Sequence, residues 1–244
     1  METLAGRNSV REALVAGRRR FERVMLAEHV AEQGLIREIQ DLCRAARISV
    51  SYVPRHALDR LADELTHQGV VAQVSPYLYV TMDEILDHAR AAGGDPLLLV
   101  LDELQDPQNV GALLRTAEAV GVHGVIIGAH RAAQITPAVS RASAGAAEHL
   151  LVCAVTNIAK ALQSLRNMGL WIAGIEDLPE AQDYRQADLK RPLALVLGSE
   201  GQGLRRLVAK QCDYLLRIPM RGRINSLNVS VAGALVLYEA LRYR

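Results

Sequence analysis

Short runs of consecutive apolar residues recur along the second half of the chain and constrain its fold more than any other feature. Five such runs occupy residues 97–101, 125–127, 171–175, 193–197 and 214–218, the last of which is interrupted by Arg217. Runs without polar alternation are typical of parallel strands that helices cover on both faces. The sequence therefore predicts a doubly wound, mainly parallel α/β sheet, whose ligands bind beyond the carboxyl ends of its strands.

The first third of the chain indicates a second, smaller α/β domain. Helix-like runs alternate with strand-like runs, at 8–16 and 34–46 for helices and at 23–27, 48–53 and 70–74 for strands. An acidic amphipathic stretch at 82–92 then meets GGDP at 93–96, a combination that ends a helix and marks a boundary. We predict domains at 1–76 and 97–244, joined by a linker at 77–96.

The composition is that of an ordinary globular protein, with 244 residues, 50% hydrophobic content and a net charge of +1. Three scattered cysteines without CxxC spacing favour neither a disulfide framework nor a metal site. The sequence shows no secretory leader, and none of its apolar stretches approaches the length of roughly 20 residues that spans a bilayer. We therefore expect a cytoplasmic protein without a membrane partner. Arginine greatly outnumbers lysine, which suits phosphate contacts, although genomic base composition explains the bias equally well.

The first of three polar loops follows the predicted strand at 97–101 and reads DPQNVG at 106–111. We expect Asn109 to cap a helix at 111–120, because an asparagine side chain accepts the unpaired amides of a first turn. Arg115 would then lie about one turn into that helix, where a guanidinium beside unpaired amides makes an anion site. A solvated surface charge is the alternative for Arg115.

The second loop follows the strand at 193–197 and reads GSEGQGL at 198–204. Its glycines permit close approach of a ligand to the backbone. The G-x-x-G-x-G spacing matches neither a dinucleotide-binding fingerprint nor a P-loop, which disfavours a nucleotide-binding oxidoreductase on a Rossmann sheet. A tight turn explains the glycines about as well, but Glu200 among them points to function.

The third loop carries IPM at 218–220 and NSLNVS at 225–230, and then opens onto an apolar run at 229–241. Asn and Ser are good helix caps, and the apolar run is too continuous for a one-sided surface helix, so we predict a buried, capped helix. All three loops leave the carboxyl ends of predicted strands. We therefore expect three groups of residues to converge: Asn109 with Arg115, Gly198 with Glu200 and Gly201, and Asn225 with Ser226 and Asn228.

At these residues the sequence resembles the SPOUT superfamily of S-adenosylmethionine-dependent RNA methyltransferases, in its SpoU (TrmH-like) 2'-O-ribose branch. The three motifs of that branch appear in order. The first is carried by Asn109, Gly111 and Arg115, the second by residues 198–201, and the third by residues 218–220 together with 226–230.

The resemblance implies a fold with a deep trefoil knot, a homodimer, and S-adenosyl-L-methionine as cofactor, with no metal. By the same resemblance the cofactor would be bound by Gly198, Gly201, Ile218, Pro219, Met220 and Leu227. Arg115 would act on the 2'-hydroxyl. Because a guanidinium stays protonated and is a poor base, we favour a role in holding phosphate and stabilising alkoxide charge. Asn109 and Asn228 would orient reacting groups, Ser226 would donate a hydrogen bond, and Glu200 would position Arg115 or the nucleotide.

The first domain bears on the substrate. Its motifs GRNSV at 6–10 and HQGVVA at 67–72 resemble the RNA-binding domain of branch members that act on ribosomal RNA. The resemblance implies methylation of a guanosine ribose in the large-subunit (23S) ribosomal RNA. A transfer RNA methyltransferase and a non-catalytic RNA-binding or ribosome-assembly protein are the alternatives. The basic run Arg18 to Arg20 is either a solvated charge run or a phosphate contact.

Overall fold

A computed structural model describes residues 1–63, 65–223 and 226–244, so Asn225 of the third loop lies outside the described residues. The chain forms two compact units, each assembled from two stretches of sequence. Unit 1 comprises Met1–Leu78 and Ile135–His149, and unit 2 comprises Tyr79–Gln134 and Leu150–Arg244.

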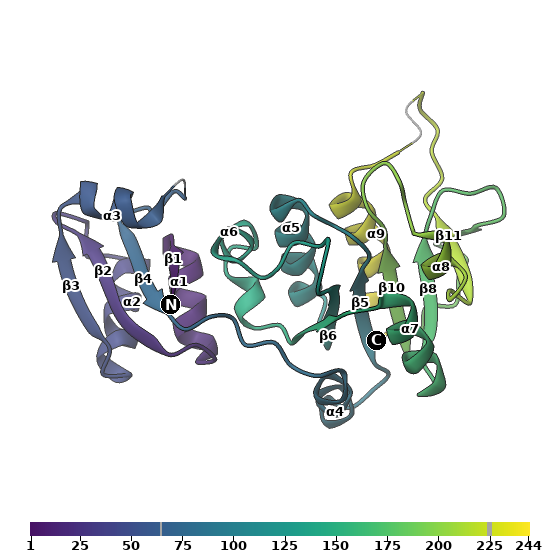
Figure 1. The fold of residues 1–244 in the computed structure, drawn as a ribbon, viewed down its shortest axis with the longest axis horizontal. Coiled ribbons are helices and arrows are strands. Elements are labelled where there is room, and N and C mark those ends of the chain that lie inside the picture. The colour runs from purple at the N-terminus through teal and green to yellow at the C-terminus, as the bar shows by residue number, and fades with distance from the viewer. Residues whose placement is uncertain (64, 224–225) are drawn as a thin grey trace. The chain divides into compact units, whose positions relative to one another are not determined.

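Unit 1 contains a four-stranded sheet in the order β1-β4-β2-β3, with only the β2–β3 pair parallel (Figure 1). Its elements are β1 (Glu2–Ala5), α1 (Arg7–Ala16), β2 (Phe21–Ala27), α2 (Leu35–Ala45), β3 (Ser49–Val53), α3 (Arg55–Ala62), β4 (Val70–Val74), α6 (Pro137–Ala142) and the 3-10 helix η1 (Ala146–Glu148). Side chains alternate between two cores: Val24 and Leu26 pack with α1 and α2, whereas Met25 and Ala27 pack with α3. This alternation is the period-two geometry of a strand.

Unit 2 contains a seven-stranded sheet in the order β7-β6-β5-β10-β8-β11-β9, with every pair parallel. Its elements are α4 (Met82–Ala92), β5 (Leu97–Leu101), α5 (Pro107–Ala119), β6 (Gly124–Gly128), β7 (Val152–Val155), α7 (Ile158–Asn167), β8 (Trp171–Ile175), β9 (Gln182–Asp183), β10 (Leu193–Leu197), α8 (Arg206–Ala209), β11 (Tyr214–Arg217) and α9 (Val229–Leu241). The predicted fold class, a small α/β domain and a mainly parallel α/β domain, is confirmed.

Helices cover both faces of the unit 2 sheet, as its non-alternating strands predicted. Ile85 of α4 and Leu162 of α7 pack with Leu98 and Val100 in one core. On the other face α9 packs against α5 so closely that a Cβ at Gly233 would lie 2.4 Å from Leu113 Cδ2. From β5 the chain adds β6 and β7 on one side of the sheet, and it places β10 and the later strands on the other side. Such a switch point, here between β5 and β10, is where ligands bind in open α/β sheets.

Two sequence expectations about helices are corrected. Helix α5 begins at Pro107 rather than at 111, with Asp106 as its cap instead of Asn109. Helix α9 is not buried on every side within one chain, because Val231, Leu235 and Tyr238 are 48%, 39% and 53% exposed. These three residues are spaced at i, i+4 and i+7 and share one helix face.

Candidate active site

The start of α5 frees Asn109 for contacts outside its own helix. Asp106 accepts the backbone N–H of Gln108 at 3.2 Å and that of Asn109 at 3.0 Å, and Pro107 occupies the first helical position. The carboxylate thus satisfies two orphan amides of the first turn, which is the role expected for Asn109. The Asn109 side chain is left to face the other loops.

Asn109, Glu200 and Asn228 form one hydrogen-bonded group from three distant motifs. Asn228 Nδ2 donates to Asn109 Oδ1 at 2.8 Å and to Glu200 Oε1 at 3.3 Å, and Asn109 Nδ2 donates to the same Glu200 oxygen. The other side of the Asn228 amide caps α9, since its Oδ1 accepts the Ser230 N–H at 2.9 Å. The predicted convergence of the three loops therefore holds for these residues.

The glycine-rich loop after β10 is closed on itself and has no room for a side chain at Gly198 or Gly203. Ser199 and Gly203 exchange two backbone hydrogen bonds of 3.1 and 3.0 Å. A Cβ at Gly198 would lie 2.2 Å from the Gly203 carbonyl carbon, and one at Gly203, whose φ is +64°, would lie 2.3 Å from Glu176 Oε1. Glycine is required at both positions for close approach, and at Gly203 also for its backbone conformation.

Two carboxylates that sequence reasoning missed anchor this loop. Glu176, directly after β8, accepts the Leu204 N–H at 2.7 Å. Asp102, directly after β5 and fully buried, accepts from the Arg205 backbone N–H at 3.1 Å and from its Nε at 2.9 Å, and this contact raises the pKa of Arg205. An acidic residue immediately after an apolar strand was the available signal for both.

A cavity of about 490 Å³ opens at the carboxyl ends of β8, β10 and β11. Its volume lies within the range of small-molecule sites, about 300–1,000 Å³. The predicted site residues that line it are Gly198, Glu200, Gly201, Ile218, Met220, Ser226, Leu227 and Asn228. A second cavity of about 340 Å³ is lined by Asn109 and shares Ser199, Glu200 and Val229 with the first.

Arg115 and Pro219 line neither cavity among the residues that the structure describes. Because α5 starts at Pro107, Arg115 lies more than two turns into the helix. It is six residues beyond Asn109, a rotation of about 240° around the axis at 3.6 residues per turn, which turns it away from that residue. The expectation that Arg115 lies one turn in is therefore wrong. Its side chain is exposed and makes no hydrogen bond or ion pair within the described part of the chain.

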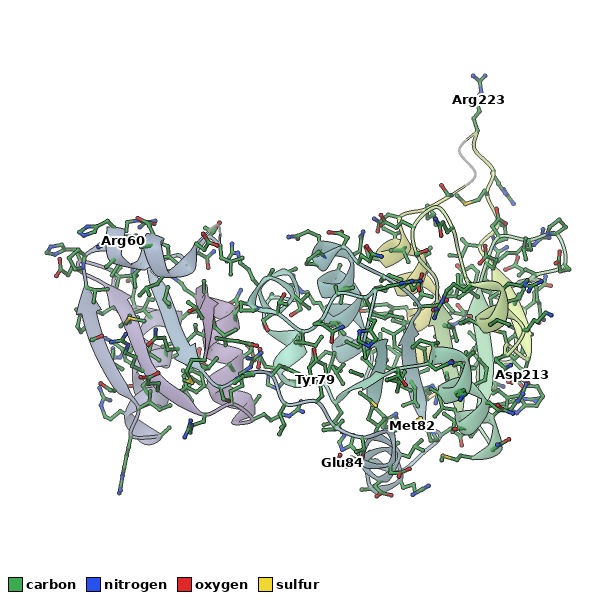
Figure 2. All side chains as sticks on the ribbon, viewed as in Figure 1. Arg60, Tyr79, Met82, Glu84, Asp213 and Arg223 are labelled. Carbon is green, nitrogen blue, oxygen red and sulfur yellow. The ribbon has the colours of Figure 1, made fainter. Side chains whose placement is uncertain are left out.

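Figure 2 shows Arg223 at the tip of the loop between β11 and α9, extending away from the ribbon.

Within the described residues, no cluster of three or more potential metal ligands occurs. No helix of that part of the chain has the length and apolar character needed to cross a membrane.

Comparisons with known proteins match this arrangement along the whole chain. Residues 96–238 match the model of the SpoU rRNA Methylase family, and residues 3–80 match that of RNA 2'-O ribose methyltransferase substrate binding. A Bacillus subtilis protein, YacO, named as a TrmH family tRNA/rRNA methyltransferase, is 42% identical over 239 residues, which are 98% of this chain and 94% of that protein.

Solved structures resemble the chain to different extents. The SpoU methyltransferase AviRb from Streptomyces viridochromogenes, in complex with AdoMet, gives a TM-score of 0.81 at 26% identity, over 98% of this chain and 89% of that one. An AdoMet-bound rRNA methyltransferase from Sinorhizobium meliloti gives a TM-score of 0.80 at 25% identity, over 99% of this chain and 87% of that one. The A. aeolicus TrmH/SpoU tRNA modifying enzyme gives 0.57 at 29% identity, over 66% of this chain and 83% of its own.

Proposed function

We propose that this chain, which belongs to the SpoU rRNA methylase family, methylates the ribose 2'-hydroxyl of a guanosine in 23S ribosomal RNA. The chain is an S-adenosylmethionine-dependent RNA 2'-O-methyltransferase, so the proposal concerns its substrate. The observation that carries the choice is the substrate-binding segment at 3–80, which extends the similarity to an rRNA methyltransferase over 99% of the chain. The similarity to the A. aeolicus tRNA modifying enzyme, in contrast, covers 66% of this chain. Guanosine follows from the resemblance of the motifs.

We assign S-adenosylmethionine to the larger cavity, whose residues suit it. Bound there, the cofactor supplies a methyl group on a positively charged sulfur. Glu176, Asp177 and Glu200 place carboxylates in the wall, which favours a cationic ligand. Ile218 and Leu227 add apolar surface, and the closed turn at Gly198 lets the ligand approach backbone. Pro219 would act by shaping the loop that carries Ile218 and Met220.

We place the ribose at the smaller cavity, because that cavity and the cofactor cavity share Glu200. S-adenosylmethionine held in the adjoining cavity would supply the methyl group to the 2'-oxygen in line with its departing sulfur, with S-adenosylhomocysteine as the leaving group and the hydroxyl proton passing to solvent. Glu200, fixed by Asn109 and Asn228, would orient the nucleotide, and Ser226 would donate a hydrogen bond beside it. Holding two reactants in line contributes much of such a rate enhancement.

Arg115 would hold the phosphate next to the target ribose and stabilise developing alkoxide charge. Its guanidinium is exposed and unpaired in the described part of the chain, so it is available to an anionic substrate. In this proposal RNA, or a second copy of the chain, brings Arg115 into the completed site.

The proposal includes a homodimer that covers α9. Val231, Leu235 and Tyr238 form an exposed apolar stripe, and a surface of this kind marks an interface. We further propose that residues 1–76 serve as the RNA-binding domain, that 97–244 carry catalysis, and that the protein works in the cytoplasm in ribosomal RNA processing.

The test is transfer of radiolabelled methyl from S-adenosylmethionine to unmodified 23S ribosomal RNA and to bulk transfer RNA, by the native chain and by Asn228→Asp. Asp caps a helix about as well as Asn, so this variant keeps α9 capped. It also sets a second carboxylate against Glu200, where Asn228 Nδ2 now donates at 3.3 Å. Asn157→Asp is the matched control, because Asn157 caps α7 in the same way at 3.0 Å.

We expect label in 23S ribosomal RNA from the native chain and from Asn157→Asp, and a loss of about 100-fold in Asn228→Asp, the scale of a misplaced reactant. Label in transfer RNA alone would move the substrate to that class. Absence of label in both RNAs would overturn the assignment of substrate. Equal rates in the two variants would overturn the role given to Asn228.

A further inference from the structure

One segment matches the SpoU methylase family model in sequence but belongs to unit 1, the unit that contains the match to the substrate-binding model. Residues 135–149 fall inside the match at 96–238, yet they form part of compact unit 1. Glu148 of this segment is 1% exposed and pairs bidentately with buried Arg19, at 2.7 and 3.0 Å. Gly145 lies so close to α1 that a Cβ would meet the Glu12 side chain at 2.6 Å. Helix α6 is therefore fixed to unit 1 by a buried ion pair and close packing.

This segment brings Arg141 of α6 onto the two sequence motifs of unit 1. A Cβ at Gly6 would lie 2.7 Å from Arg141 Nη1 and 3.7 Å from Gln68 Oε1. The Arg141 guanidinium thus lies directly against the Gly6 backbone, beside the Gln68 side chain. Arg7, the next residue, donates from Nε to the Gln68 carbonyl at 3.1 Å. Two arginines that are 134 positions apart in sequence share one small surface.

The turn that completes this surface is held by hydrogen bonds of a buried histidine. Gln68 and Gly69 both have positive φ, 51° and 83°. Buried His67 holds the turn, because its Nδ1 accepts the Gly69 N–H at 3.0 Å and its Nε2 pairs with Asp59 at 2.8 Å. The hydrogen bonds of His67 therefore fix the position of Gln68, and the Gln68 carbonyl in turn positions the Arg7 side chain.

Neither arginine has an acidic partner in the described part of unit 1. Arg141 makes no side-chain hydrogen bond or ion pair there, and Arg7 bonds to the neutral Gln68. The carboxylates that lie against these elements are engaged elsewhere: Glu12 pairs with Arg11 and His149, and Asp59 pairs with His67. Two half-buried arginines without acidic partners make a site for an external anion.

We propose that Arg141 and Arg7 together bind a backbone phosphate of the substrate RNA, so that the substrate-binding surface is completed by a residue from the methylase sequence. This inference rests on the proposed function for the identity of the RNA. The planar fork of each guanidinium suits phosphate oxygens, and RNA presents such phosphates regularly along its backbone. Gly6 belongs to the site because any side chain there would displace Arg141.

The test is equilibrium binding of full-length chain to unmodified 23S ribosomal RNA over a series of KCl concentrations. The variants are Arg141→Gln and Arg7→Gln, with Arg141→Lys to retain the charge. Arg44→Gln is the matched control, since Arg44 lies in the same unit but is 78% exposed and paired with Asp41. Hydrogen exchange of β2 and β4, which belong to unit 1, checks that each variant is folded.

A lost phosphate contact lowers the slope of log affinity against log salt by about 0.7–0.9. We expect that decrease in Arg141→Gln and in Arg7→Gln, with weaker RNA binding in both, and no decrease in Arg44→Gln or Arg141→Lys. A slope and affinity in Arg141→Gln equal to those of the native chain would overturn the inference, and so would failure of the native chain to bind the RNA. Arg141-dependent binding without methyl transfer would instead keep this site and overturn the proposed function.

Discussion

Replacing Glu148 by glutamine removes one charge from a buried pair and leaves the other in place. Burial lowers the pKa of Arg19, but its hydrogen bonds with Glu148 outweigh this effect and the net pKa is raised, so Arg19 stays charged. Breaking such a pair costs about 3–5 kcal/mol. Glu2 remains as a partner for Arg19 at 2.5 Å, with its side chain 27% exposed, so we expect the lower end, about 3 kcal/mol.

The measurement is urea unfolding followed by hydrogen exchange of β2 and β4. The sole tryptophan, Trp171, lies in unit 2, so its fluorescence does not report on unit 1. With a urea dependence of about 1–3 kcal/mol per M, the midpoint for unit 1 falls by about 1–3 M. Asp41→Asn is the control, because it breaks an exposed pair with Arg44 and costs about 0–1 kcal/mol.

A double variant, Arg19→Met with Glu148→Leu, separates the charge from the packing. Removing both members of a buried pair is often neutral, so the double variant should recover most of the stability lost in Glu148→Gln. Equal losses in the double and single variants would refute the reasoning. A Glu148→Gln cost no greater than that of Asp41→Asn would refute it as well.

Three further outcomes are expected. Gly203→Ala forces a Cβ against Glu176 at a φ of +64°, so isothermal titration should detect little S-adenosylmethionine binding; native affinity would contradict the loop assignment. Leu235→Asp in the apolar stripe should give a monomer by light scattering, whereas Leu207→Asp, on an exposed α8 residue, should not. Burial raises the pKa of Cys43 from 9.0 to about 11, so the folded state retains a proton that the unfolded state loses; stability falls as pH rises from 9 to 11, less so in Cys43→Ala.

Five of the seven strands in unit 2 were predictable because they are largely apolar runs, whereas β7 and β9 were not predicted. The bounds of β5, β8 and β10 coincide with the predicted runs, and the position of the loops at their carboxyl ends follows from parallel pairing. Strand β1 and helix α3 carried no comparable signal. β1 pairs antiparallel at a sheet edge, and α3 is a helix of eight residues, so both depend on tertiary contacts.

The detail of the site was less predictable, since neighbouring residues compete for the same local role. Asp106 and Asn109 are both good caps, and the start of α5 depends on which of them is used. That choice shifts the helix start by four residues, from 111 to Pro107, and changes the place of Arg115 by more than one turn. Glu176 and Asp102 anchor a loop that is remote in sequence, so local patterns do not reveal their partners.

The amide at position 228 shows how the three motifs determine one another's residue types. Asn228 donates to Asn109 and Glu200 from its nitrogen while its oxygen accepts from Ser230, so it needs a donor and an acceptor on one short side chain. Asp would satisfy only the cap, and Ser would not span both sides. Asn109 is under a similar demand, because it donates to Glu200 and accepts from Asn228. A single carboxylate at Glu200 thus requires amides at both neighbouring positions, which explains why the motifs occur together before any ligand is considered.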